Sequence, residues 1–303
     1  MAEKLEKKVI QGISWSLFEK FGIQLLQFLL FIVLARILMP TDFGMIGIVM
    51  ALFAIAQVFI DGGFSKAYVQ KEKVTETDSN TLFYTNLIIS VFAYIVLWIS
   101  APYIANFYED NLLVELVRVM GAVLIINAFN IIHIAQLTRI LNFKFKAQAT
   151  LIGILISGVL SITVAVNGFG VWSLVLQQLS NRFFTALFLW IKSSWKPSFK
   201  VSFRSFKDMF SFGIWVLLGG VIQAIFSNIY TLTIGKFFSF AQLGFYRKAK
   251  SLQQYGSEYP SQAITSVAFS LFSRNQNDNL KLFNNLKQIL NFTVGCLVPL
   301  LLI

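Results

Sequence analysis

A stripe of basic and polar side chains between residues 247 and 261 is the feature of this sequence best suited to bind a ligand. Its members recur at spacings of three or four, so one face of a helix would present them together. They are Arg247, Lys250, Gln254, Ser257, Glu258 and Ser261, with Lys248 beside them. Arg and Lys form charge-assisted hydrogen bonds with the oxygens of phosphates. The stripe therefore predicts a site for an anionic group.

The other chemically capable residues argue against an enzyme. The chain has one histidine, His133, and one cysteine, Cys296, which excludes a multi-histidine metal site and an internal disulfide. No Ser/His/Asp or Cys/His set can be assembled, and no GxGxxG or Walker motif occurs. We expect no catalytic residue, no metal and no cofactor, and we expect His133 to be structural.

The elements that must position the stripe are membrane helices. The chain is 56% hydrophobic and 13% charged, whereas soluble domains are nearer half apolar and a quarter charged. The apolar residues come in blocks of about twenty, the length that crosses a bilayer as a helix. The net charge of +11 does not predict a nucleic-acid partner, because basic residues of membrane proteins gather in cytoplasmic loops.

The sequence predicts an all-α, polytopic membrane protein with about nine spans. The predicted spans are 15–38, 43–60, 82–104, 113–135, 150–166, 171–191, 210–234, 243–272 and 289–303. Basic residues precede the first span and follow the second, fourth and sixth, while the loops after the third and fifth have almost none. The positive-inside rule then places the N-terminus in the cytoplasm. Segments 139–147 and 195–210 mix bases with aromatics, which predicts that they lie on anionic lipid rather than bind RNA.

The position of the stripe in span eight leaves two interpretations open. One basic residue in mid-bilayer costs about 2.5–3.5 kcal/mol, so three facing lipid would cost on the order of 8–10 kcal/mol. The stripe either lines a water-filled cavity, which its length favours, or lies at the outer interface where long side chains reach water. Gln57 and Arg118 are further cavity candidates. Either could instead bond to a neighbouring helix, and Arg118 could lie at the outer interface.

An internal repeat is predicted at an interval of 200 residues. This shift brings Trp15 onto Trp215 and the basic end of one apolar run, Arg36, onto Lys236. It also brings Phe43-Gly44 onto Leu243-Gly244. Six spans lie within the shift, so both copies would have the same orientation, as in parallel repeats about an axis normal to the membrane. The expected domains are a six-helix lobe at 1–191, a cytoplasmic linker at 192–209, and the start of a second lobe at 210–303 that ends within the ninth span.

Several short runs resemble the polysaccharide transporter family, which includes O-antigen and exopolysaccharide flippases within the multidrug/oligosaccharidyl-lipid/polysaccharide superfamily. The first is Ala35-Arg36-Ile37-Leu38 with Pro40 and Asp42-Phe43-Gly44, followed by Asp61-Gly62-Gly63-Phe64 and Tyr68-Val69-Gln70. The second is Gly235-Lys236 with Leu243-Gly244-Phe245-Tyr246-Arg247-Lys248-Ala249, and the third runs from Arg139 to Phe143-Lys144.

The resemblance implies two six-helix lobes around a central cavity, the second incomplete here. It implies a bacterial inner membrane protein that moves undecaprenyl-pyrophosphate-linked oligosaccharide by alternating access, for O-antigen, capsule or exopolysaccharide synthesis. The expected partners are this substrate, the bilayer, and a polysaccharide polymerase with its chain-length machinery. Two alternatives stay open: a multidrug-type cation/drug antiporter, for which Glu19, Asp61 and Glu258 are the candidate carboxylates, and a truncated remnant that transports nothing.

Overall fold

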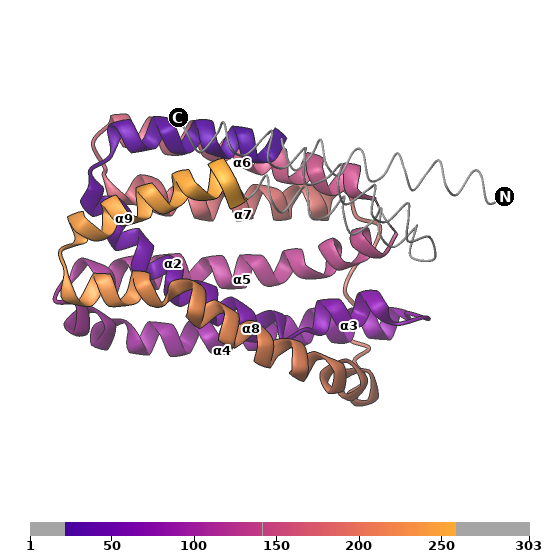
Figure 1. Ribbon diagram of the computed structural model, residues 1–303. Coiled ribbons are helices and arrows are strands. Elements are labelled where there is room, and N and C mark those ends of the chain that lie inside the picture. Colours follow the sequence, from indigo (N-terminus) through magenta and orange to yellow (C-terminus); the bar gives the residue numbers. More distant parts are fainter. Residues whose placement is uncertain (1–21, 141, 259–303) are drawn as a thin grey trace, which may run out of the picture.

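The computed structural model describes residues 22–140 and 142–258, and in these ranges it is helical with no strand. Figure 1 shows the helices running back and forth beside one another. An apolar helix, Gly22–Ile37, comes first. It is followed by α2 (Pro40–Asp61), α3 (Phe64–Gln70), α4 (Glu76–Tyr108), α5 (Leu112–Arg139), α6 (Phe143–Val166), α7 (Val171–Lys192), α8 (Phe203–Phe237), α9 (Phe240–Gln253) and a short π-helix, η1 (Gln254–Glu258).

Five of these helices are long and apolar enough to cross a membrane, namely α2, α4, α5, α8 and the Lys144–Val166 part of α6. They confirm the prediction of an all-α polytopic membrane protein. Helix α7 occupies predicted span six but is more polar, because Gln177, Gln178, Asn181 and Arg182 fall within it. The ninth predicted span and the end of the eighth lie outside the described residues.

Two helix starts differ from the sequence prediction. Helix α4 begins at Glu76, because Thr75 accepts a hydrogen bond from the Asp78 amide and Asp78 bonds back to the Thr75 amide. Such a capping box starts a helix within polar sequence. Helix α8 begins at Phe203, inside the predicted 192–209 linker, because the Ser202 side chain caps it. Hydropathy alone does not detect either polar first turn.

The turn before α2 recurs before α9 with the same backbone geometry. Met39 has φ −70° and ψ 153°, and Ser239 has φ −70° and ψ 154°. The Met39 amide donates to Oδ2 of Asp42 at 2.9 Å, and the Ser239 amide donates to Oε1 of Gln242 at 3.0 Å. The local structure therefore repeats at the predicted interval of 200 residues.

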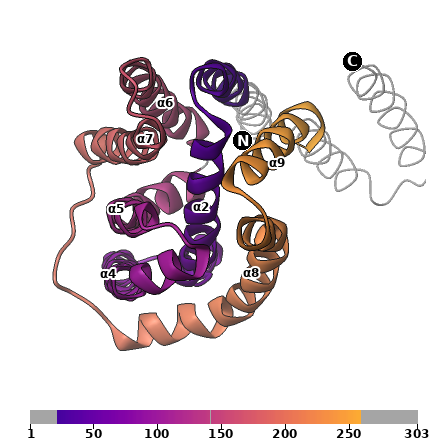
Figure 2. The ribbon, with the colours of Figure 1, turned by 90° about the vertical axis from the view of Figure 1, so that its left-hand side faces the viewer.

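Helices α2 and α9 lie side by side (Figure 2). They touch through a reciprocal pair of glycine contacts. A methyl group on Gly44 would clash with the carbonyl oxygen of Phe240, and one on Gly244 would clash with the carbonyl oxygen of Pro40. Positions 40 and 44 correspond to 240 and 244 in the repeat. A two-fold rotation would exchange the two contacts, so the repeats meet about an approximate two-fold axis at the first turns of α2 and α9.

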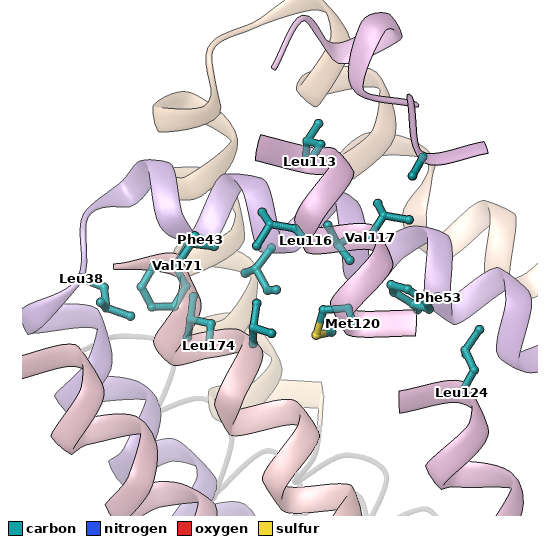
Figure 3. Close-up of a cluster of buried hydrophobic side chains, with 14 of the residues drawn as sticks. Leu38, Phe43, Phe53, Leu113, Leu116, Val117, Met120, Leu124, Val171 and Leu174 are labelled. Atoms are coloured by element: carbon teal, nitrogen blue, oxygen red, sulfur yellow. The ribbon is translucent and has the colours of Figure 1, made fainter. Parts of the chain in front are cut away.

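A cluster of buried apolar side chains fills the bundle near the same turns (Figure 3). It joins the first turns of α2 to α5 and α7, and it includes Leu38, Phe43, Leu116, Met120 and Leu174. Lipid tails are as apolar as these side chains, so close van der Waals packing rather than exclusion from water holds such a core. The cluster fixes one end of the first repeat.

An aromatic cluster fills the opposite end. The ring of His133, which is 2% exposed, lies 4.8 Å from that of Trp190 and 5.8 Å from that of Trp195. This buried position agrees with the structural role expected of His133, whose Nε2 has no hydrogen-bond partner among the described residues. The prediction that residues 195–210 all lie on lipid is wrong for Trp195, which packs inward on Phe83. It remains a prediction for Phe199, which is 93% exposed.

Arg139, at the end of α5, holds the segment after α3. Its guanidinium donates to the carbonyl oxygens of Val69 at 3.1 Å and Glu72 at 2.7 Å, and also to that of Lys71. Helix ends leave such carbonyls without partners, and a basic side chain commonly satisfies them. Arg139 therefore links the C-terminal end of α3 to α5 by hydrogen bonds.

Replacing Arg139 with Ala should destabilise the purified full-length protein by about 2–3 kcal/mol, because several carbonyls lose a charged donor. The measurement is the melting temperature in detergent. Arg139→Lys should recover part of the loss, since one ammonium cannot reach all the carbonyls as a planar fork does. An unchanged melting temperature for Arg139→Ala would contradict this role.

Candidate functional site

The three basic residues of the predicted stripe point to different surroundings. Arg247 lies across α2, where a methyl group on Gly47 would be 3.1 Å from its Nε and 3.2 Å from its Cγ. Its guanidinium makes no hydrogen bond or ion pair with any residue that the structure describes. A planar, permanently charged group without a protein partner is suited to bind an oxyanion. Among the three, Arg247 best fits the predicted site.

Lys248 has a structural position instead. Its Nζ donates to the carbonyl oxygens of Ala35 at 2.9 Å and Leu38 at 3.3 Å, and lies 4.7 Å from the ring centroid of Phe43. The equivalent residue of the first repeat, Ile48, packs within 2.8 Å of where a methyl group on Gly235 would lie. The contact of Lys248 with Ala35 is thus polar, whereas the equivalent contact of Ile48 with Gly235 is apolar.

Lys250 and the rest of the stripe face α8 and η1. The Nζ of Lys250 donates to the carbonyl oxygen of Ser227 on α8 at 2.8 Å. Gln254 and Glu258 begin and end the π-helix η1, and Glu258 is exposed. A π-helical turn changes which residues share a face, and such turns are frequent at functional sites. The stripe is therefore not one continuous face.

Arg118 lies away from the other candidates. Its guanidinium carbon is 4.8 Å from the ring centroid of Trp98 on α4. Its Nε is buried without a hydrogen-bond partner among the described residues. The side chain fills the contact between α4 and α5 and does not line the cavity described next.

Gln57 lines a cavity of about 580 Å³ between α2, α3, α5, α7 and α8. The cavity lies at the end of the bundle that carries the basic loops, because its walls include α3 and the last turns of α5 (Figure 1). Its lining residues are Gln57, Asp61, Ser65, Lys66, Val69, Gln70, Asn127, Ile131, Ile134, Ala135, Thr138, Arg182 and Phe212. The volume is in the range of small-molecule sites, about 300–1,000 Å³.

Several polar side chains of this cavity have no hydrogen-bond partner among the residues that the structure describes. Gln57, Asn127 and Arg182 form no side-chain hydrogen bond with any described residue. Asp61 accepts one bond at Oδ1, from Ser65 Oγ at 2.5 Å. Gln57 and Asn127 are half-buried and Arg182 is exposed, so these groups are available to a ligand or to water. No cluster of three metal-ligating side chains occurs in the described part of the chain.

Asn127 and Arg182 were not among the site residues predicted from the sequence. Each lies within a predicted span, where a polar residue is a default candidate for function. Asn127 interrupts an apolar run and was detectable on that ground, although Asn130 and His133 follow in the same span. Arg182 lies in a polar cluster whose members the sequence alone does not rank.

The family model and three relatives of this chain have names that refer to polysaccharide synthesis. The family model described as "Polysaccharide biosynthesis protein" matches residues 33–303. Teichuronic acid biosynthesis protein TuaB of Bacillus subtilis is 26% identical over 280 residues, which cover 91% of this chain and 57% of that protein. Succinoglycan biosynthesis transport protein ExoT of Rhizobium meliloti is 22% identical, over 97% of this chain and 60% of that protein.

A third relative extends the comparison to lipopolysaccharide synthesis. Lipopolysaccharide biosynthesis protein WzxC of Escherichia coli is 24% identical, over 95% of this chain and 59% of that protein. The chain thus spans less than two thirds of the length of these relatives. No solved structure matches. The match to the family model covers most of the sequence, and the chain belongs to the polysaccharide biosynthesis protein family.

Proposed function

We propose that this chain carries the substrate pathway of a flippase for oligosaccharide linked to undecaprenyl pyrophosphate, in the plasma membrane of a bacterium. The names of ExoT, a transport protein, and of the other relatives support a role in surface polysaccharide synthesis. The observation that carries the proposal is the pair of repeats that meet through Gly44 and Gly244, beside Arg247, whose guanidinium has no hydrogen-bond or ion-pair partner among residues 22–140 and 142–258. A polymerase with its chain-length machinery would consume the product.

The proposed orientation places the basic loops in the cytoplasm. The loops after α2, α5 and α7 lie at one end of the bundle, and the turns after α4, α6 and α8 lie at the other (Figure 1). By the positive-inside rule the first end and the N-terminus face the cytoplasm. The glycine contact then closes the pathway on the outer side, while the cavity at Gln57 lies on the cytoplasmic side.

The proposed mechanism is alternating access between lobes 1–191 and 210–303. The pyrophosphate would bind Arg247, with Lys250 close by once its bond to Ser227 is exchanged for one to the ligand. The glycan would occupy the cavity at Gln57, and the lipid tail would stay in the bilayer. Transfer to the outside would require the contact between α2 and α9 to open. These steps break no covalent bond, so they require no catalytic residue.

Deletion of the gene in its own host tests the function. We expect surface polysaccharide to fall and lipid-linked oligosaccharide to accumulate on the cytoplasmic leaflet, because synthesis continues while translocation stops. Complementation with the full-length gene should restore both. A drug-hypersensitive strain with normal polysaccharide would support the antiporter instead and overturn the flippase proposal.

A further inference from the structure

The segment between α7 and α8, residues 193–202, passes around the edge of the bundle as a strap without helix (Figure 2). Hydrogen bonds hold this strap against the first turns of α4. The buried side chain of Asn80 accepts from the Ser198 amide at 3.0 Å and donates to Ser198 Oγ at 2.7 Å. Thr81 Oγ1 accepts from the Ser202 amide at 3.1 Å. Because its backbone is held at two points, the strap presents a defined outer surface.

The first turns of α8 continue this surface. Figure 2 looks along the bundle and shows them lying across it, and in Figure 1 they lie at the end that carries α3. A helix that lies across a bundle of membrane-spanning helices is parallel to the plane of the membrane. Its inner side packs on α3, where the ring centroids of Phe206 and Phe64 are 5.7 Å apart and Met209 is buried. Its outer side therefore faces the surroundings of the bundle.

Apolar side chains project outward from both the strap and the start of α8. Phe199 is 93% exposed, and Phe203 and Val201 are also exposed. The ring of Phe199 stacks on that of Tyr84 at 5.7 Å between centroids, so its direction is fixed although it is exposed. Aromatic side chains are enriched where lipid headgroups meet acyl chains. The outer surface is therefore suited to the membrane interface.

Lysines are interleaved with these apolar side chains. Lys196, Lys200 and Lys207 are exposed, and they form no hydrogen bond or ion pair with any residue that the structure describes. An ammonium group donates hydrogen bonds to phosphate oxygens as a point charge. The three lysines can therefore bind phosphate groups without breaking a contact within the described part of the protein.

The other exposed charges of this surface do not cancel those of the lysines. Arg204 and Asp208 are four residues apart on α8 and have opposite charges, so they offset each other. Glu76, at the start of α4, accepts a hydrogen bond from the strap at 3.4 Å and adds one negative charge. Lys192, at the end of α7, adds one positive charge. The surface thus keeps an excess of positive charge that is equal to its three lysines.

We propose that the strap and the start of α8 form a binding site for anionic phospholipid headgroups in the leaflet at this end of the bundle. The lysines would bind the phosphates, while Phe199 and Phe203 would insert between the headgroups. Asn80 is a positioning residue, because it holds the strap with this surface outward. The site is additional to the proposed transport pathway. Exposed aromatics in the plane of the membrane favour lipid over RNA as the partner.

The test uses the purified full-length protein in detergent micelles, titrated with phosphatidylglycerol or with phosphatidylcholine of the same acyl chains. Phosphatidylglycerol should raise the melting temperature by several degrees, and phosphatidylcholine should not, because its headgroup has no net charge. Lys196→Gln/Lys200→Gln/Lys207→Gln should raise the half-maximal concentration of phosphatidylglycerol about tenfold or more, since each lysine contributes about fivefold. Concentrated salt should weaken the wild-type response.

Matched variants show whether position matters as well as charge. Lys200→Gln should weaken the response about fivefold. Lys73→Gln removes an exposed lysine between α3 and α4, and it should respond as the wild type does. Asn80→Ala should respond more weakly from its own starting melting temperature, because the strap loses both bonds to Asn80 while every lysine remains. Phe199→Ser should also weaken the response, and Phe199→Trp should retain it.

Equal responses to the two lipids, or a wild-type response in the triple lysine variant, would overturn the lipid site. The same melting-temperature shift with glycerol phosphate, which has no acyl chain, would overturn it in favour of a site for free phosphate. A larger shift with a homopolymeric RNA would overturn it in favour of RNA. An unchanged response in Asn80→Ala would overturn the positioning role of Asn80. These measurements need no polysaccharide export, so their outcome is distinct from that of the flippase test.

Discussion

Replacing Arg247 with Ala is expected to lower surface polysaccharide at least tenfold in cells that carry the full-length protein. The guanidinium lies over Gly47 and has no hydrogen-bond partner in the part of the chain that the structure describes, so its charge-assisted hydrogen bonds are available to the substrate. Bonds to charged groups contribute about 1.5–3 kcal/mol each, and the loss of one costs about tenfold or more in affinity. The measurement is exported polysaccharide per cell at matched protein levels.

Three companion variants make this result specific. Arg247→Lys should be intermediate, because an ammonium keeps the charge but lacks the planar fork. Arg204→Ala, at an exposed position near the start of α8, should export normally. Lys248→Ala should lower the melting temperature rather than the affinity, since Lys248 bonds to the carbonyls of Ala35 and Leu38. Normal export by Arg247→Ala would show that Arg247 does not contact the substrate.

The repeat could be predicted from the sequence because its landmarks are local. The turns before α2 and α9 depend on a polar side chain that bonds back to the backbone three residues earlier, Asp42 in one copy and Gln242 in the other. The glycines that allow close packing, Gly44 and Gly244, follow at the same offset. Local turn chemistry and glycine spacing can be read directly along a chain, even where the identity between copies is low.

The binding site could be predicted only in part, because it depends on which helices meet. Arg247 and Lys248 are neighbours in the sequence, yet successive residues of a helix point about 100° apart. One lies over α2, and the other reaches the end of the Gly22–Ile37 helix. Gln57, Asn127 and Arg182 come from three helices and share a cavity only after these have packed. The helical periodicity of the sequence assigns each residue to one face of its helix. It does not say which other helix packs against that face.

Replacing Gly244 with Ala is expected to abolish most export, because its methyl group cannot fit against the carbonyl of Pro40. Overpacking a well-packed contact typically costs about 1–3 kcal/mol, and here the obstructing atom belongs to the backbone. The first turns of α2 and α9 must therefore separate, which destabilises the state that we propose is closed on the outer side. We expect a melting temperature several degrees lower and at least a tenfold loss of polysaccharide.

Gly44→Ala should behave like Gly244→Ala, since the two contacts are related by the repeat. Once one methyl group has separated the helices, the second meets less resistance, so the double variant should cost less than the sum of the single ones. Gly219→Ala is the matched control, because a methyl group there meets nothing within 4 Å. If the costs of Gly44→Ala and Gly244→Ala add fully, or if both variants resemble Gly219→Ala, the two glycines do not share one contact, and the proposed outer closure is contradicted.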